Sequence, residues 1–210
     1  MNALEVLRFL RSEKICPVRP ENLAYEFGVK RPAAERMLNR LSEAGVVPKI
    51  SRGLWWNPFY PPPNPLCLHR TIASDSYVSL LTALWYHGII HQRPFVVTCV
   101  RWAGRSFVCR NEYGEYQFTR IPRKLVFGVK EVEGHGFAVA EPEKAFLDHL
   151  YVSRFVEKRH PRLVELDLEG LDPDKLKRYA ARMGARMLRY LCETGLDDPR
   201  RWPGLAPVVL

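Results

Sequence analysis

A proline-rich run divides this chain of 210 residues more sharply than any other feature. Residues 59–66 read FYPPPNPL and hold four of the chain's 17 prolines. Proline fixes its own backbone torsion and has no N–H to donate, so such a run continues neither a helix nor a central strand. We therefore expect a linker at residues 61–66, with one domain in residues 1–60 before it and a second domain after it.

The N-terminal domain has the order of a winged helix-turn-helix. Apolar side chains at helical spacing predict three helices within residues 3–14, 20–29 and 30–47. Two short strands follow, joined by a turn at residues 51–53. Three helices followed by a hairpin predict a DNA-binding domain whose third helix enters the major groove.

Tryptophans stand side by side in the second strand of this hairpin, at Trp55 and Trp56. Successive side chains of a strand point to opposite faces. We expect one of the two rings to pack inward and the other to keep an exposed edge.

The charge of the chain favours a polyanionic partner. Its 32 basic and 23 acidic residues give a net charge of +9, and nucleic acid is the first candidate for a basic protein. On the third helix, basic and amide side chains lie opposite the apolar stripe, where they can reach base edges, and the hairpin turn is basic too. Three small helices and a hairpin also occur in protein–protein modules, so a solvated basic face is the alternative. The residues that we predict to contact double-stranded DNA are Lys30, Arg31, Arg36, Asn39, Arg40, Lys49 and Arg52.

The second part of the chain predicts a mixed α/β domain at residues 67–165. A helix is expected at residues 76–87. Four strands are expected after it, followed by a helix through Leu150. A helical extension is expected at residues 166–210, with a basic side. The predicted fold class is α+β, with a winged helix-turn-helix, a small antiparallel or mixed sheet and C-terminal helices.

A cluster of charged residues in AEPEKAFLDHLY, residues 140–151, resembles an active site at first reading. Lys144 and Asp148 are four residues apart on one helix face and are expected to pair. Glu141 and Glu143 lie at the helix N-terminus, where the helix dipole favours negative charge. Ordinary structural roles therefore account for the cluster.

Motifs of catalysis and of metal binding are missing from the sequence. It has no Walker loop, no GxSxG and no HExxH. His87 and His91 are four residues apart, but Gly88 interrupts the helix between them and no third ligand is evident. We expect no enzyme activity, no cofactor and no metal. No apolar run approaches the roughly 20 residues of a membrane helix, so we expect no membrane partner and a cytoplasmic location.

Two motifs resemble the AbiEi family of antitoxins from AbiE abortive-infection toxin–antitoxin systems. The first is a Y-x-S-x-x-x-A-L-x-x-H-G pattern and the second is A-x-P-E-K-A-x-x-D-x-x-Y. They follow a winged helix, as in that family, and the resemblance covers about residues 1–155. The matching positions are Tyr77, Ser79, Ala83, Leu84, His87 and Gly88 in the first motif, and Ala140, Pro142, Glu143, Lys144, Ala145, Asp148 and Tyr151 in the second.

This resemblance implies a phage-defence protein that represses its own operon. The winged helix would bind repeats in its own promoter, and the second domain would counter a cognate toxin similar to nucleotidyltransferases, without a stable complex. The motif residues are expected either to support the structure of the second domain or to contact its partner, and they are Tyr77, His87, Glu143, Lys144, Asp148 and Tyr151. Two alternatives are a winged-helix regulator that senses an unrelated ligand or partner, and a nuclease guided by its winged helix. The acid-poor strands of residues 95–130 count against a nuclease, because metal catalysis needs carboxylates.

Overall fold

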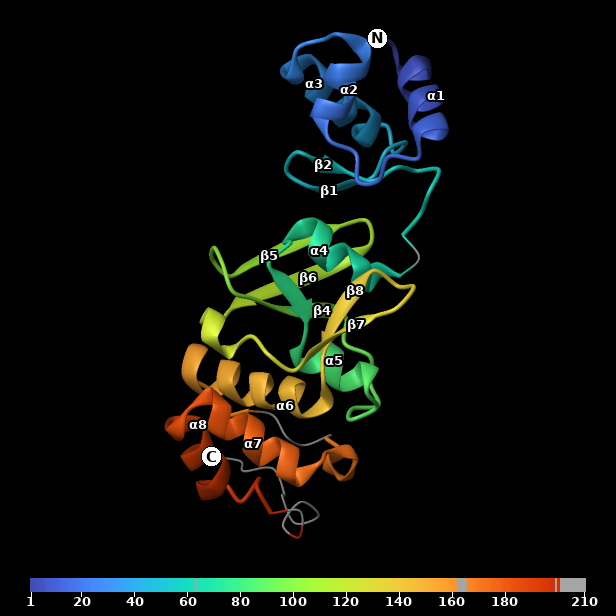
Figure 1. Ribbon diagram of the computed structural model, residues 1–210. Coiled ribbons are helices and arrows are strands. Elements are labelled where there is room, and N and C mark those ends of the chain that lie inside the picture. Colours follow the sequence, from blue (N-terminus) through green and yellow to red (C-terminus); the bar gives the residue numbers. More distant parts are fainter. Residues whose placement is uncertain (63, 162–165, 199, 201–210) are drawn as a thin grey trace.

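The N-terminal and the C-terminal helices lie at opposite ends of the molecule, with the strands between them (Figure 1). The computed structural model describes residues 1–62, 64–161, 166–198 and 200. Figure 1 shows the N-terminal helices at one end, then a small hairpin, then a larger sheet, and the C-terminal helices at the other end. The predicted linker, second domain and C-terminal extension include Pro63, residues 162–165, and residues 199 and 201–210, which lie outside the described residues.

The N-terminal part is a winged helix-turn-helix, as predicted. Its elements are α1 (Ala3–Glu13), α2 (Pro20–Phe27), α3 (Arg31–Glu43), β1 (Lys49–Ser51) and β2 (Leu54–Trp55). Helix α1 begins with a capping box, in which Asn2 accepts from the Glu5 N–H and the Glu5 carboxylate accepts from the Asn2 N–H. Helix α2 ends at Gly28, whose φ of +59° favours glycine.

A third short strand segment completes the hairpin. The Val18 N–H donates to the Trp55 carbonyl at 2.8 Å, and the Trp55 N–H donates back to the Val18 carbonyl at 3.0 Å. Val18 precedes α2, so this bridge ties the start of the helix-turn-helix to the hairpin. The core of the N-terminal domain is formed by apolar side chains from all three helices and from the hairpin.

The second part contains a six-stranded mixed sheet with the order β5-β6-β4-β3-β8-β7. Pairs β4–β6 and β3–β8 are parallel, and the other neighbours are antiparallel. The helices and strands are α4 (Leu68–Ile72), β3 (Ser76–Val78), α5 (Leu80–Tyr86), β4 (Val96–Arg101), β5 (Phe107–Asn111), β6 (Gly114–Arg120), β7 (Val129–Val132), β8 (Phe137–Ala140), α6 (Pro142–Tyr151), α7 (Pro173–Met183) and α8 (Ala185–Glu193). Short 3₁₀ turns lie at Pro65–Cys67, Arg123–Leu125 and Leu168–Gly170, and a π-helical turn lies at Val152–Val156. The predicted α+β class is confirmed.

The helix expected at residues 76–87 was wrong in its first four residues. Ser76–Val78 forms β3, a central strand of the sheet, and only Leu80–Tyr86 is helical. A three-residue strand with buried side chains on both faces has no alternation, so its apolar residues imitate a helical stripe. The carboxylate of Asp75, directly before this strand, binds the Arg101 guanidinium at 2.8 Å and 3.1 Å.

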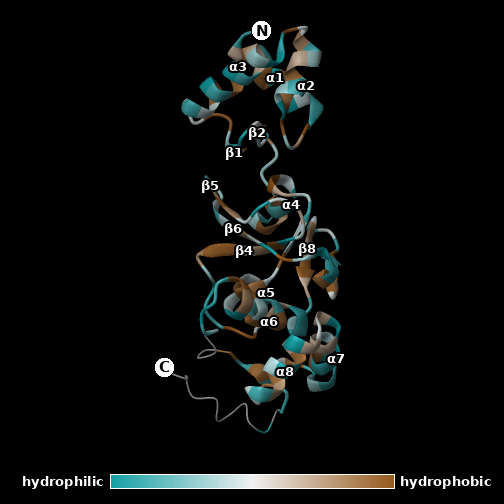
Figure 2. Cartoon of the chain, turned by 90° about the vertical axis from the view of Figure 1, so that its left-hand side faces the viewer, coloured by the Kyte–Doolittle hydropathy of each residue, from teal (hydrophilic) through white to brown (hydrophobic). Residues whose placement is uncertain are grey.

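Helices α5 and α6 cover one face of the sheet, and α4 lies on the other (Figure 1). Strand β4, which lies between these layers, is strongly hydrophobic, as Figure 2 shows. Helix α7 packs on α6, and apolar residues from Leu168 to Leu196 belong to the same core as the sheet. The predicted C-terminal helices therefore extend the second core. None of the helices in the described ranges is long and apolar enough to cross a membrane.

The hairpin lies between the two cores. Trp55 packs in the core of the N-terminal helices, and Trp56 packs with Ile50 and Leu54 in the core of the sheet. Both rings are buried, with exposed fractions of 0% and 8%. The expected exposed tryptophan edge was therefore wrong, because the second domain covers the face of the hairpin that an isolated winged helix would leave in solvent.

Candidate nucleic-acid interface

Helix α3 presents the predicted polar face to solvent. Its buried residues are Ala34, Met37, Leu38 and Leu41, which pack against α1 and α2. Arg36 and Arg40 lie on the other side of the helix and are exposed. This is the arrangement in which a recognition helix can reach base edges.

Contacts within the N-terminal domain hold several predicted residues in place. The Lys49 ammonium donates to Asn39 Oδ1 at 2.8 Å, which joins α3 to the first strand of the hairpin. Lys49 also lies over the Trp55 ring, 5.3 Å from its centroid. The Arg31 guanidinium pairs with Glu21 of α2 at 2.6 Å. The hydrogen bond fixes Asn39 and Lys49 relative to each other. The ion pair with Glu21 neutralises part of the positive charge of Arg31.

The remaining predicted residues lie around this centre. Lys30 is the exposed N-cap residue of α3, and Arg52 is exposed in the turn between β1 and β2. The Arg40 guanidinium lies against the Met37 sulfur at 3.1 Å. Glu35 and Glu43 lie on the solvent side of α3 as well, so the face is mixed in charge rather than uniformly basic.

Hydrogen bonds connect the hairpin to the sheet of the second domain. The Ile50 carbonyl of β1 accepts from the Cys109 thiol and from Asn111 Nδ2 of β5, each at 3.2 Å. On the linker side, Asn57 Nδ2 donates to the Leu10 carbonyl at 2.7 Å. Contacts on both sides therefore hold the hairpin in one orientation relative to α1 and to the sheet.

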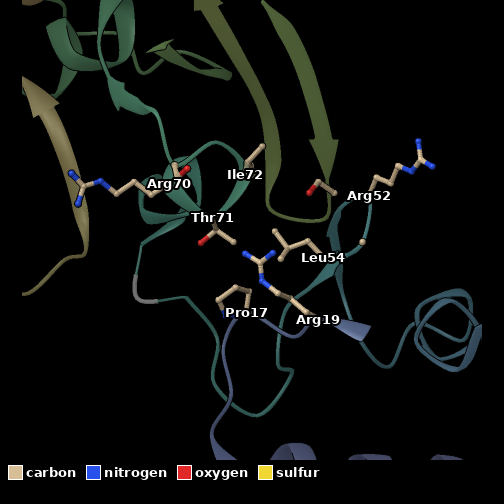
Figure 3. Close-up of a pocket in the computed structure, with 10 residues that line it drawn as sticks. Pro17, Arg19, Arg52, Leu54, Arg70, Thr71 and Ile72 are labelled. Atoms are coloured by element: carbon tan, nitrogen blue, oxygen red, sulfur yellow. The ribbon is translucent and has the colours of Figure 1, made fainter. Parts of the chain in front are cut away.

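Sequence reasoning missed Arg19, which lies beside the hairpin. This exposed residue is the N-cap of α2, and its side chain is directed towards Leu54 and Thr71 in Figure 3. The available signal was a basic residue directly before Pro20, the first residue of the helix. The side chain of Arg19 therefore places a positive charge at the N-terminus of α2, the first helix of the helix-turn-helix.

The motif residues of the second domain gather in a buried polar cluster. Asp148 pairs with Lys144 and accepts from the Tyr77 hydroxyl at 2.9 Å and from Ser79 Oγ at 2.8 Å. Lys144 and Asp148 are both 0% exposed, and the ammonium lies 5.1 Å from the Phe127 ring centroid. The predicted Lys144–Asp148 pair is confirmed, and it joins α6 to β3 and to the start of α5.

Burial controls the ionisation of this cluster. It lowers the pKa of the Lys144 ammonium, although the Asp148 carboxylate acts in the opposite direction. It also raises the pKa of the Tyr77 hydroxyl well above its usual value, with a further contribution from Asp148. Side chains without exposed surface cannot contact a substrate, so this geometry gives the cluster a structural role.

The other motif residues also connect elements of the second domain. Glu143 pairs with Lys175 of α7 at 2.8 Å and accepts from the Asp172 N–H at 3.1 Å. His87 Nε2 donates to the Ala140 carbonyl at 2.7 Å, and burial lowers the pKa of this imidazole. The half-buried Tyr151 ring packs against Phe155.

Metal-ligand side chains do not gather in the described part of the chain. No group of three or more His, Cys, Asp and Glu residues is arranged there to hold an ion. His91, the partner of His87 in the sequence spacing, is exposed, whereas His87 is engaged with Ala140. The described residues thus form no recognisable metal centre.

Comparison with known proteins concerns the fold alone. No family model matches the sequence, and no curated protein matches it either. Among solved structures, the crystal structure of the Rv2827c protein from Mycobacterium tuberculosis is similar, with a TM-score of 0.59 and 16% sequence identity. The match covers 96% of this chain and 79% of that chain. The N-terminal helices, the mixed sheet and the C-terminal helices of this chain therefore form an arrangement that the mycobacterial protein shares.

Proposed function

We propose that this chain binds double-stranded DNA through α3 and represses transcription of its own operon. The observation that carries the proposal is the polar face of α3, the third helix of a winged helix-turn-helix, where the exposed Arg36 and Arg40 flank the half-buried Asn39. Arginine donates two parallel hydrogen bonds to guanine, whereas the asparagine amide donates one hydrogen bond to adenine N7 and accepts one from its N6 amino group. These side chains would read base edges in the major groove.

The residues around this face would fix the position of the protein on the duplex. Lys30 at the N-cap of α3, Lys49 in β1 and Arg52 in the hairpin turn are exposed cations, and Lys and Arg side chains supply many of the phosphate contacts that position a protein on DNA. Lys49 donates a hydrogen bond to Asn39. A contact of Lys49 with a DNA phosphate would therefore also orient the Asn39 amide towards the bases.

We further propose that the second domain is the antitoxin part and carries no catalytic activity. Support comes from the two motifs that resemble AbiEi antitoxins and from the structural role of the charged residues in the second motif. Lys144, Asp148 and Glu143 are buried and paired with groups inside the protein. The toxin would be opposed by the outer surface of this domain or through repression, with no stable complex required.

Fluorescence anisotropy with DNA from upstream of its own gene tests the proposal. We expect at least tenfold tighter binding to this DNA than to a scrambled duplex. Arg36→Ala should weaken specific binding by about 1–3 kcal/mol if Arg36 contacts a base. Arg8→Ala is the matched control, because Arg8 is an exposed arginine of α1 and its loss removes the same charge. Equal binding to both duplexes, or equal effects of the two substitutions, would refute the assignment of α3 as the reading helix.

A further inference from the structure

A groove separates the hairpin from α4, at the junction of the two domains. It has a volume of about 480 Å³ and lies beside the β1–β2 turn (Figure 3). The residues that line it come from the segment before α2, from the hairpin and from α4 with the loop after it. Among them are Arg19, Arg52, Leu54, Arg70 and Thr71.

The walls of this groove suit an anion. Three arginines line it, together with the hydroxyl-bearing residues Ser51, Thr71 and Ser74. Within the described part of the chain, none of the lining residues carries a carboxylate. Arginine binds phosphate oxygens with parallel N–H donors, and hydroxyls add neutral donors.

The three arginines differ in where their guanidinium groups lie. Figure 3 shows Arg19 directed between Leu54 and Thr71, whereas the Arg52 side chain extends away from the groove at the hairpin turn. Arg70 is directed to the other side, where it pairs with Glu131 of β7. Among the described residues, no carboxylate forms an ion pair with Arg19. Arg19 is therefore the arginine best placed to receive an anion inside the groove.

The size and polarity of the groove limit what can occupy it. A volume of 480 Å³ falls within the roughly 300–1,000 Å³ of small-molecule sites. Such sites are mostly apolar, whereas polar side chains dominate here, which favours a charged group over an apolar ligand.

We propose that this groove binds a phosphate ester, with Arg19 as its main ligand and Arg52 at its rim. One source of the phosphate is the backbone of the DNA bound by α3, and this source rests on the proposed function. Arg19 and Arg52 then extend the phosphate contacts of the hairpin towards α4. The other source is a free phosphorylated small molecule, which would occupy the groove without DNA.

Two measurements on the full chain separate these sources. The first is the dependence of DNA affinity on salt for the wild type, Arg19→Ala and the control Arg8→Ala. Loss of one phosphate contact reduces the slope of log K against log[salt] by about 0.9. The second is calorimetric titration of the DNA-free proteins with inorganic pyrophosphate. Circular dichroism checks that Arg19→Ala, which alters an exposed side chain, remains folded.

Each result decides the proposal. A slope reduced by about 0.9 in Arg19→Ala but not in Arg8→Ala would assign the groove to the DNA backbone. Unchanged DNA binding, with one pyrophosphate bound by the wild type and at least tenfold weaker binding by Arg19→Ala, would assign it to a free phosphate ester. Unchanged slopes and no pyrophosphate binding would overturn it. Failure of the wild type to prefer its own promoter would refute autorepression alone, because both measurements on Arg19 can still be made.

Discussion

Replacing Asp148 with alanine tests the role of the buried polar cluster most directly. The substitution would leave the Lys144 ammonium in the core without its carboxylate, and would also remove the acceptor for Tyr77 and Ser79. Removing one partner of a buried ion pair costs about 3–5 kcal/mol, because the other charge stays uncompensated. We expect a loss of this size in the free energy of unfolding at pH 7, measured by urea denaturation.

The loss should depend on pH in a direction set by Lys144. Burial already lowers the pKa of this ammonium below its ordinary value of 10.5, and without Asp148 the pKa would fall further. Between the folded-state pKa and 10.5 the unfolded chain binds more protons, so stability rises with pH. The difference between Asp148→Ala and wild type should therefore shrink as the pH rises towards 10.5.

Two further variants make this test specific. Glu131→Ala removes an exposed carboxylate that pairs with Arg70, and it should cost no more than about 1 kcal/mol. The double substitution Lys144→Met with Asp148→Leu removes both charges and should recover most of the loss. A cost below about 1 kcal/mol for Asp148→Ala, or a loss of DNA affinity with unchanged stability, would refute a structural role for the cluster.

Two other predictions concern the second core. Burial lowers the pKa of His69 to about 3, so its stabilising contribution is complete above pH 6.5 and is lost as the pH falls from 6.5 towards 3. The free energy of unfolding should therefore fall less steeply with decreasing pH in His69→Gln than in wild type. An unchanged pH dependence in His69→Gln would contradict this prediction. An equal reduction in the control His135→Gln, which alters an exposed histidine, would also contradict it. Gly128→Ala should cost about 2–4 kcal/mol in urea, because a Cβ there would meet Tyr179 Cε2 at 2.7 Å and φ is +61°. Gly134→Ala has a similar φ of +74° and no atom within 4 Å of the added Cβ, so equal costs would remove the steric argument.

The sequence predicts the N-terminal domain well because its signals are local. Gly28 and Gly45 stop helices with positive φ. Elsewhere in the chain, Asp172 caps α7 by accepting from the Asp174 and Lys175 N–H groups. The Lys144–Asp148 pair is equally local, being one helical turn. Periodicity and capping residues decide such features without knowledge of the rest of the fold.

Features that depend on distant segments could not be predicted in this way. Ser76–Val78 becomes a strand because β4 and β8 pair with it from both sides. Trp56 is buried because the sheet covers the hairpin. Arg19 becomes a candidate phosphate ligand only when α4, about fifty residues later, is placed opposite it. Each of these outcomes is set by tertiary contacts rather than by propensity.

The adjacent tryptophans offer an optical view of how the two domains are connected. Trp55 belongs to one core and Trp56 to the other, although a single peptide bond joins them. Tryptophan emission shifts to longer wavelength when water reaches the indole. Two variants can each keep one of these rings, with all other tryptophans replaced. The emission of each variant then reports on the core around the ring that it keeps. If the hairpin transmits stability between the domains, both variants will show the same melting curve. DNA added to the N-terminal domain should then also protect the ring on the side of the sheet.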